Sequence, residues 1–340
     1  MKRRRLFFYL AVCALIAGFA GCKKGADDTV KPIETLDRTK YMDEAVLTVD
    51  GAEIGYRECM LYLQAVKQEY ENAYGDGIWQ YMLDAEGTTL GEKVKNRTLE
   101  QVIYVKIVCA QAKKLGIELD SEEKSRVAER TEEYMGKAEY STLALYGIAR
   151  KDVEQVYADT ALAQKVYDSV TLNVDTDISN AEVAQKHLQS LVLKNYHEDE
   201  LGNRTPLTVQ ELIATLDRFD ALYEEAKGTK DFYSLAYANT EDKTYLDVMV
   251  GDGDLPTELL DAYNLETGEV MQIRTDNGYY LFYCVSGYDE DATIAKKEEL
   301  IALRQEEAFK KLYGEWRAVA TVETNEEIRQ VIDRDLEAGS

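Results

Sequence analysis

Apolar residues recur at the spacing of amphipathic helices over most of residues 55–170. Immediately before this region, the stretch 46–49 has the composition of a short strand and ends at an Asp-Gly turn. Two of the helices are expected to meet between Gly147 and Lys151. The pattern therefore predicts a mostly helical region that opens with one short strand.

The expected helix ends carry residues with capping chemistry. The stretch that contains Leu99, Ile103 and Ile107 stops at Gly116, and glycine suits the left-handed backbone that often ends a helix. Ser121 precedes three charged residues and is the expected N-cap of the next helix. These signals divide the region into several helices.

After Thr176 the pattern changes to shorter segments, which indicates a smaller mixed unit followed by a long charged helix. The expected elements are a helix from Ser179, a strand at 190–193, a helix at 206–227, turns and short strands at 231–285, an amphipathic helix from Thr293 to Arg317 and a strand at 318–324.

This order of elements predicts an α+β protein of two domains. We expect the stretch 318–324 to pair with 45–51, so that the C-terminus completes the N-terminal domain. The expected organisation is a signal peptide at 1–21, a flexible tether at 22–43, a helical domain at 44–177, a small α+β domain at 178–288 and a returning helix and strand at 289–335.

The N-terminus predicts export. Basic residues at 2–5 precede an apolar run at 6–19 that is short for a permanent transmembrane helix. The sequence Phe-Ala-Gly-Cys at 19–22 resembles a bacterial lipoprotein processing site, which implies lipidation of Cys22 and attachment to the extracytoplasmic face of the cell membrane. An ordinary secretory signal and a transmembrane anchor are the alternatives.

Composition limits the partners and the chemistry. Without residues 1–21 the chain has 36 basic residues against 64 acidic ones, a formal charge of −28. Such a surface repels nucleic acid, so no nucleic-acid partner is expected. Hydrophobic residues make up 45% of the sequence, which is ample for packed cores.

Cysteine and histidine are scarce. Beyond the signal and Cys22, only Cys59, Cys109 and Cys284 remain, and they are expected to be buried hydrophobic residues rather than a disulfide framework. The whole chain has two histidines, which excludes His-rich metal sites. A glycine-rich phosphate loop is also missing from the sequence. We expect neither a metal nor a cofactor.

Several motifs, taken in order, resemble the SurA and PrsA class of exported foldases. The run 49–59, followed by a helix that ends at 112–117, resembles their N-terminal chaperone region. The unit from about 183 to 287 resembles their parvulin-type peptidyl-prolyl isomerase domain in degenerate form. The pieces that carry this second resemblance are Asp-Phe-Tyr-Ser-Leu-Ala at 231–236, Leu-Leu-Asp-Ala-Tyr-Asn-Leu-Glu-Thr-Gly-Glu-Val at 259–270, and the stretch 273–285 with its Asn277-Gly278 turn.

The resemblance implies which residues matter. A parvulin lowers a rotation barrier of about 18–20 kcal/mol by binding the twisted amide, so it needs a shaped pocket and no nucleophile. In the family, an apolar cup takes the proline ring and two histidines anchor a polar network beneath it. Here Ser190 and Tyr280 stand at the two histidine positions. We expect His187 at the end of a helix and His197 in a solvated loop.

Two main function classes stay open. The first is a membrane-anchored chaperone or foldase for unfolded or partly folded exported polypeptides, with weak or no isomerase activity. The second is an active peptidyl-prolyl isomerase that uses substitute polar groups, and a remote third is a lipoprotein that binds one dedicated partner or an envelope polymer. The candidate residues of the degenerate pocket are Ser190, Tyr280, Asp247 and Asp252, with Leu255 and Leu259 lining the proline cup.

Overall fold

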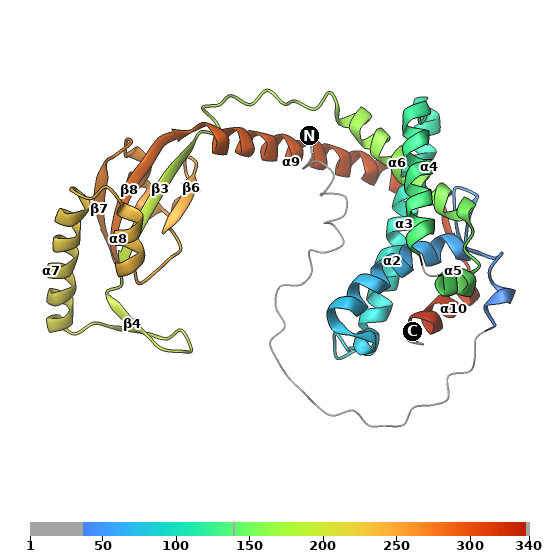
Figure 1. Ribbon diagram of the computed structural model, residues 1–340, viewed down its shortest axis with the longest axis horizontal. Coiled ribbons are helices and arrows are strands. Elements are labelled where there is room, and N and C mark those ends of the chain that lie inside the picture. The colour runs from blue at the N-terminus through green and yellow to red at the C-terminus, as the bar shows by residue number, and fades with distance from the viewer. Residues whose placement is uncertain (1–36, 139, 338–340) are drawn as a thin grey trace.

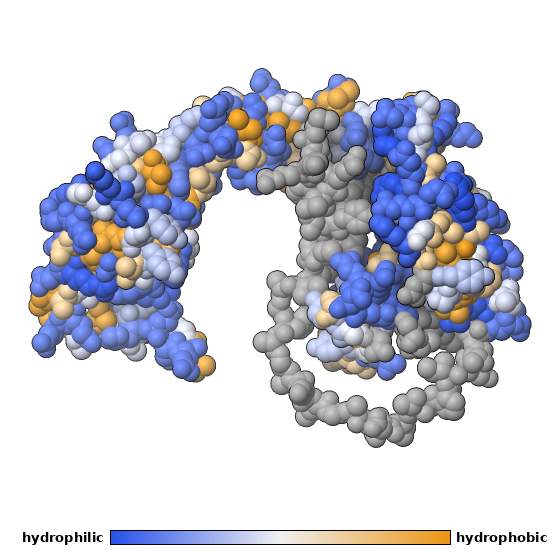
Figure 2. Space-filling view, in the orientation of Figure 1, coloured by the Kyte–Doolittle hydropathy of each residue, from blue (hydrophilic) through white to orange (hydrophobic). Residues whose placement is uncertain are grey.

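The computed structural model describes residues 37–138 and 140–337. It forms an arch in which two lobes are joined by one long helix, α9 (Glu290–Val319) (Figure 1). We call them the helical lobe, which contains the elements before residue 172 and after residue 320, and the sheet lobe, residues 185–289. Hydrophilic residues cover most of the visible surface of both lobes, in keeping with the acidic composition (Figure 2).

A small sheet ties both ends of the described chain together in the helical lobe. Its order is β2-β1-β9, and both pairings are antiparallel. The register places Val49 opposite Val322 and Leu47 opposite Thr324, which confirms the predicted pairing of the C-terminal strand. The three strands are β1 (Ala45–Val49), β2 (Ala52–Gly55) and β9 (Val322–Thr324).

The helices of this lobe follow the predicted order, and their caps explain where they end. Gly116 adopts the left-handed conformation with φ of 68° and closes the second long helix, as predicted. The N-cap of the next helix is Asp120 rather than Ser121, because Asp120 forms a capping box with Glu123. The helices are α2 (Tyr56–Tyr74), α3 (Leu90–Leu115), α4 (Ser121–Lys137), α5 (Tyr140–Tyr146) and α6 (Arg150–Thr171), with 3-10 turns η1 (Arg38–Lys40) and η2 (Asp76–Gln80).

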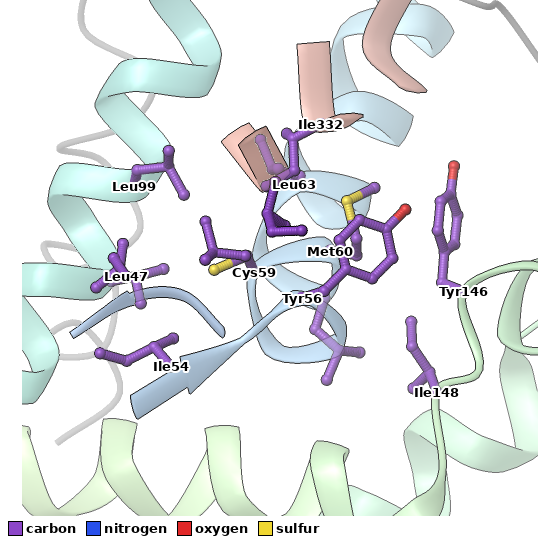
Figure 3. Close-up of a cluster of buried hydrophobic side chains, with 14 of the residues drawn as sticks. Leu47, Ile54, Tyr56, Cys59, Met60, Leu63, Leu99, Tyr146, Ile148 and Ile332 are labelled. Carbon is purple, nitrogen blue, oxygen red and sulfur yellow. The ribbon is translucent and has the colours of Figure 1, made fainter. Parts of the chain in front are cut away.

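A helix that the sequence pattern did not predict completes the core of this lobe. Helix α10 (Glu326–Glu337) follows β9 and inserts Ile328, Val331 and Ile332, none of them more than 3% exposed. They join α2, α3, the small sheet and the segment after α5 in one cluster, part of which is drawn in Figure 3. The C-terminal segment therefore supplies core residues as well as a strand.

The sheet lobe is built on a four-stranded antiparallel sheet of order β6-β3-β8-β7. Helices cover one face, and a 3-10 segment with its flanking loops covers the other. The strands are β3 (Gln185–Leu193), β6 (Asp247–Val250), β7 (Val270–Thr275) and β8 (Gly278–Asp289), with a separate hairpin of β4 (Tyr196–Glu198) and β5 (Arg204–Pro206). The covering elements are α7 (Val209–Ala226), α8 (Phe232–Asn239) and η3 (Thr257–Asn264).

Three predicted helix and strand assignments in this lobe differ from the structure. No helix starts at Ser179, because Ser179 and Glu182 satisfy each other within a single turn and the chain then becomes extended at Gln185. The stretch 232–239, predicted as turns and strands, is helix α8, capped by Asp231. Helix α7 starts at Val209, three residues later than predicted.

Helix α9 packs onto the helical lobe through aromatic residues near its C-terminal end. Phe309 lies 4.9 Å from Tyr167 and Tyr313 lies 4.8 Å from Tyr104, measured between ring centroids. At its other end the Thr293 hydroxyl accepts a hydrogen bond from the backbone amide of Gln185. Each end of the helix is thus fixed to one lobe.

The predicted signal peptide, 1–21, and Cys22 lie outside the described residues. Of the expected tether, 22–43, only the last residues are described. Arg38–Lys40 form a 3-10 turn and Tyr41 packs against the core of the helical lobe, so ordered structure begins before residue 44. Within the described ranges, no helix is long and apolar enough to cross a membrane.

Candidate functional site

Ser190 and Tyr280 lie on the two central strands of the sheet lobe and on the same face. Strands β3 and β8 pair so that Ser190 is opposite Phe282, and Tyr280 is opposite Val192. Alternate residues of a strand point to the same side, so Ser190 and Tyr280 are diagonal neighbours on the face that η3 covers. We call this side of the sheet the η3 face.

The side chain of Ser190 belongs to the core. Its exposed fraction is zero, and its hydroxyl donates a hydrogen bond to the backbone carbonyl of Tyr245 at 2.7 Å. This satisfies the buried hydroxyl. Ser190 therefore holds the loop before β6 onto β3 and does not present a free polar group at the surface of the sheet.

Tyr280 is only partly buried, and its ring lies beside that of Phe282. Its ring stacks on that of Phe282, with centroids 6.2 Å apart and an interplanar angle of 9°. Phe282 also contacts Tyr245, with ring centroids 6.5 Å apart. Burial, followed by the nearby carboxylate of Asp242, raises the pKa of Tyr280, so the phenol stays protonated at neutral pH. Phe282 and Tyr245 were not among the predicted site residues, because the register that places them here is set by strand pairing.

The turn before Tyr280 differs by one residue from the prediction. The two-residue loop consists of Asp276 and Asn277, and Gly278 is already the first residue of β8. Gly278 has a φ of 145°, and a Cβ at this position would lie 2.7 Å from the carbonyl oxygen of Leu193. Glycine is therefore required for the close approach of the turn to β3.

Asp247 lies on the other side of the sheet and cannot act with Ser190 and Tyr280. It pairs with Gln189, whose side chain alternates with Ser190, and its Oδ1 lies 2.7 Å from the Nε2 of His187. Burial disfavours the charged form of Asp247, but hydrogen bonds from Gln189 and His187 outweigh this effect and hold its pKa below the ordinary value. His187 is thus part of β3, where a helix end was predicted.

Asp252 is on the η3 side but far from Tyr280. Burial, and then the Asp252 carboxylate, raises the pKa of Tyr263, whose hydroxyl donates to the Ala184 carbonyl at 3.3 Å. Ala184 precedes Val192 by eight residues, which corresponds to about 26 Å along a strand. Asp252 is therefore placed at the opposite end of the sheet from Tyr280.

Leu255 and Leu259 lie beneath the η3 face as core residues. They are 4% and 1% exposed and pack with Phe282 in one cluster. They pack in the same cluster as the Phe282 ring and leave little of their own surface open to a ligand. The second histidine, His197, is exposed on β4 beside Glu211, which agrees with the predicted solvated position.

The arrangement favours binding over acid–base chemistry. No histidine lies on the η3 face in the described part of the chain, and Ser190 is bonded to a backbone carbonyl. Residues 37–138 and 140–337 contain no group of three or more His, Cys, Asp or Glu side chains suited to holding a metal ion. Of the candidate residues on this face, Tyr280 keeps a half-buried ring that is partly open to solvent.

Comparisons with known proteins cover both lobes. The solved structure of the peptidylprolyl isomerase PrsA from Bacillus cereus aligns with a TM-score of 0.32 and 15% identity over 76% of this chain and 91% of that chain. A SurA-like chaperone of Campylobacter jejuni aligns with a TM-score of 0.32 and 12% identity over 83% of this chain and 99% of that chain.

Sequence comparisons cover most of the chain. Residues 2–142 match the model of the SurA-like N-terminal domain. The foldase protein PrsA of Clostridium botulinum strain Langeland is 22% identical over 281 residues, which cover 78% of this chain and 82% of the relative. The same protein from strain Okra gives the same identity and coverage. The chain therefore carries a SurA-like N-terminal domain and is similar to PrsA foldases over most of its length.

Proposed function

We propose that this protein is a membrane-anchored extracytoplasmic chaperone or foldase for exported proteins, with weak or no prolyl isomerase activity. The observation that supports weak activity most directly is the burial of Ser190, whose hydroxyl is bonded to the Tyr245 carbonyl. An isomerase must bind the twisted amide more tightly than the planar one. A hydroxyl that is bonded within the core does not supply that preference.

The chaperone part of the proposal is supported by the architecture. Two lobes joined by one long helix present a large surface on either side of the hollow that the space-filling view shows between them (Figure 2). The family includes foldases by name, and the SurA-like domain comprises most of the helical lobe. Unfolded or partly folded exported polypeptides are the clients we propose.

An active isomerase remains the second candidate, and Tyr280 is the residue that favours it. Its ring is half-buried on the η3 face, which places an aromatic surface beside the position where the family binds proline. Activity of this kind would rest on Tyr280 without help from Asp247, which lies on the other face.

The two candidates are separated by two assays on the exported chain. The first measures suppression of aggregation of a proline-free client, and the second measures the slow phase of a refolding reaction limited by prolyl isomerisation. We expect suppression of aggregation with little or no acceleration of the slow phase. Acceleration that Tyr280→Phe abolishes would support the isomerase instead.

Tyr279→Phe is the matched control for that variant. Tyr279 is the neighbouring tyrosine, but it lies on the helix-covered face, where it packs against Phe219 with ring centroids 5.4 Å apart. It loses the same hydroxyl without touching the η3 face. If both variants lower the rate equally, the change reflects stability and the isomerase assignment to Tyr280 fails.

We also propose that residues 1–21 are removed as a signal and that Cys22 is lipidated. We further propose that the two domains span 44–177 and 178–288, and that residues 289–335 return to the first domain. The composition of 2–22 supports the first two proposals. Metabolic labelling with a radioactive fatty acid tests the anchor. Cys22→Ser should abolish both labelling and membrane retention, whereas Cys59→Ser should leave both unchanged, since Cys59 is buried in α2.

A further inference from the structure

Strand β7 is an edge strand of the sheet lobe. It pairs with β8 on one side, and no described strand pairs with its other side. In an antiparallel pair every second residue bonds to the neighbouring strand, so the residues between them direct their backbone groups outward. The carbonyl of Glu269 accepts a hydrogen bond from the amide of Cys284, which sets the alternation. The residues whose backbone groups face outward are Val270, Gln272 and Arg274.

The outward backbone groups of these three residues have no partner in the described chain. No hydrogen bond between described residues uses the backbone amide or the carbonyl of Val270, Gln272 or Arg274. They recur at every second residue, which is a spacing of about 6.6 Å along the strand. An extended polypeptide carries amides and carbonyls at the same spacing. The chemistry of this edge therefore matches an extended backbone.

The β7 edge also lacks the features that usually block an exposed edge, such as proline, lysine, a bulge or a very short strand. It has six residues without proline or lysine, and its register with β8 is unbroken. Its one charged side chain, Arg274, bonds to Asp220 of α7 at 2.9 Å and lies over the ring of Phe219. The opposite edge strand, β6, has four residues and carries the exposed carboxylate of Asp247. Of the two edges, β7 is the open one.

A hollow of about 500 Å³ follows the same edge. Its lining includes four consecutive residues of the edge, 269–272, together with Tyr223 of α7 on one side of the sheet and Leu265 at the end of η3 on the other. Tyr223 and Val270 belong to the core on the helix side, and Leu265 and Met271 to the core on the η3 side. The hollow therefore lies where a further strand would run, and its apolar walls suit an apolar side chain of that strand.

Charge favours a client segment over a second copy of this chain as the occupant. The exported chain has a formal charge of −28, and a second copy would bring the same charge to the interface. Glu269, in the wall of the hollow, is exposed and forms no salt bridge with any described residue. A segment with few acidic residues avoids this repulsion.

We propose that the outer edge of β7 binds an extended segment of an unfolded polypeptide as a fifth strand of the sheet. Backbone hydrogen bonds hold the segment, and one of its apolar side chains enters the hollow. This inference rests on the proposed function, because it takes unfolded chains as the ligands. It adds a second surface, separate from the η3 face, that recognises the backbone and does not require proline.

The probe is a fluorescent peptide of alternating valine and threonine that ends in one lysine and contains no proline. Its twin carries N-methyl groups on the central amides of both edges, which removes the backbone donors and keeps every side chain. Fluorescence anisotropy measures binding to the full exported chain. We expect the twin to bind at least about tenfold more weakly, because each hydrogen bond contributes a factor of about two to ten.

Gln272→Pro tests the edge from the side of the protein. Proline removes the outward amide of residue 272 and no hydrogen bond to β8, which is the position where an edge strand tolerates proline. We expect about tenfold weaker binding of the unmethylated peptide. The matched control, Gln272→Ala, removes the same side chain and keeps the amide, so its affinity should stay within about twofold of the wild type. Circular dichroism checks that both variants are folded.

Hydrogen exchange followed by NMR tests the site without any variant. In the free chain the amides of Val270, Gln272 and Arg274 should exchange rapidly, whereas those of Met271 and Ile273 are protected by β8. Bound peptide should protect the three outward amides. Exchange that stays rapid when the peptide is bound would place the peptide elsewhere and overturn the proposal.

Other results would also overturn it. Equal binding of the peptide and its methylated twin would show that the backbone is not recognised. Dimerisation in sedimentation that Gln272→Pro abolishes would assign the edge to a second copy. Suppression of aggregation by a chain that does not bind the peptide would overturn this site alone. Binding at β7 without suppression would support the site and count against the chaperone function.

Discussion

The helical lobe is assembled from both ends of the described chain, whereas the sheet lobe folds from one continuous stretch, residues 185–289. Strand β9 and helix α10 return to β1, α2 and α3 after the whole sheet lobe has been made. In the sheet lobe every strand pairs with another from the same stretch. The helical lobe therefore depends on contacts that are distant in sequence, and the sheet lobe does not.

The lobes also bury polar groups differently. In the helical lobe, Lys106 of α3 forms ion pairs with Glu58 at 2.7 Å and Asp159 at 2.6 Å, which connect α2, α3 and α6. Burial disfavours the charged form of Lys106, but the two carboxylates outweigh it and raise its pKa. In the sheet lobe, the buried hydroxyl of Ser190 is bonded to a backbone carbonyl. One lobe relies on a charge network, and the other on apolar contacts with a neutral hydrogen bond.

The largest effect is expected from truncation at residue 319. This removes β9 and three buried aliphatic residues, each of which is worth about 2–5 kcal/mol, so the helical lobe should lose its fold. Both tryptophans of the sequence, Trp79 and Trp316, lie in or against this lobe, so tryptophan emission should shift to the red.

The fragment 178–296 is the counterpart of that truncation and should fold on its own. Far-ultraviolet circular dichroism and a cooperative thermal transition would establish this. Removal of residues 338–340 alone is the control for the truncation and should leave emission unchanged. A folded helical lobe in the chain ending at 319 would contradict the dependence on distant segments.

Lys106→Met should destabilise the helical lobe by about 3–5 kcal/mol, because it leaves the buried carboxylates of Glu58 and Asp159 without their cation. Urea unfolding followed by tryptophan emission measures the change. Lys113→Met is the control on the same helix: that side chain is exposed, and a cost below about 0.5 kcal/mol is expected. Similar costs for the two variants would mean that the ion pairs contribute little.

A matched pair of core variants tests whether the lobes unfold separately. Ile332→Ala in the helical lobe and Leu281→Ala in the sheet lobe should each cost about 2–5 kcal/mol, since both side chains are fully buried. Only Ile332→Ala should lower the midpoint seen by tryptophan emission. If Leu281→Ala shifts that midpoint equally, the two lobes form a single cooperative unit.

The smallest effect concerns pH. Burial raises the pKa of Glu58 above its ordinary value of 4.5, although Lys106 lowers it in part. The folded state thus binds this proton more tightly than the unfolded state. The contribution of Glu58 to the free energy of unfolding should therefore increase as the pH falls through its folded pKa toward 4.5.

The pH dependence is measured as the difference between the wild-type chain and Glu58→Gln in urea unfolding between pH 7 and pH 5. The wild type should gain stability relative to the variant on acidification. Glu53→Gln, an exposed position on β2, should show no such gain. A difference of the opposite sign would mean that the pairing with Lys106 outweighs burial.

Local signals predicted the helical lobe well and the sheet lobe less well. Gly116 ended its helix as expected because a left-handed residue needs no tertiary contact. The cap at Ser179 failed because the same local bonds also satisfy one isolated turn, and only the pairing of β3 decides that the chain then extends. Helix α10 was missed although its apolar residues lie at helical spacing, at positions 328, 331 and 332.

The sequence by itself predicted the mostly helical region at 55–170, the shorter mixed elements after it and the return of the C-terminal strand to the first one. The tertiary structure alone decided which of the candidates lie together. A strand alternates its side chains between two faces, so pairing assigns Ser190 and Tyr280 to one face and Asp247 to the other. The hydrogen bond that satisfies the buried Ser190 hydroxyl depends on Tyr245, in the loop before β6, which is distant in sequence from β3.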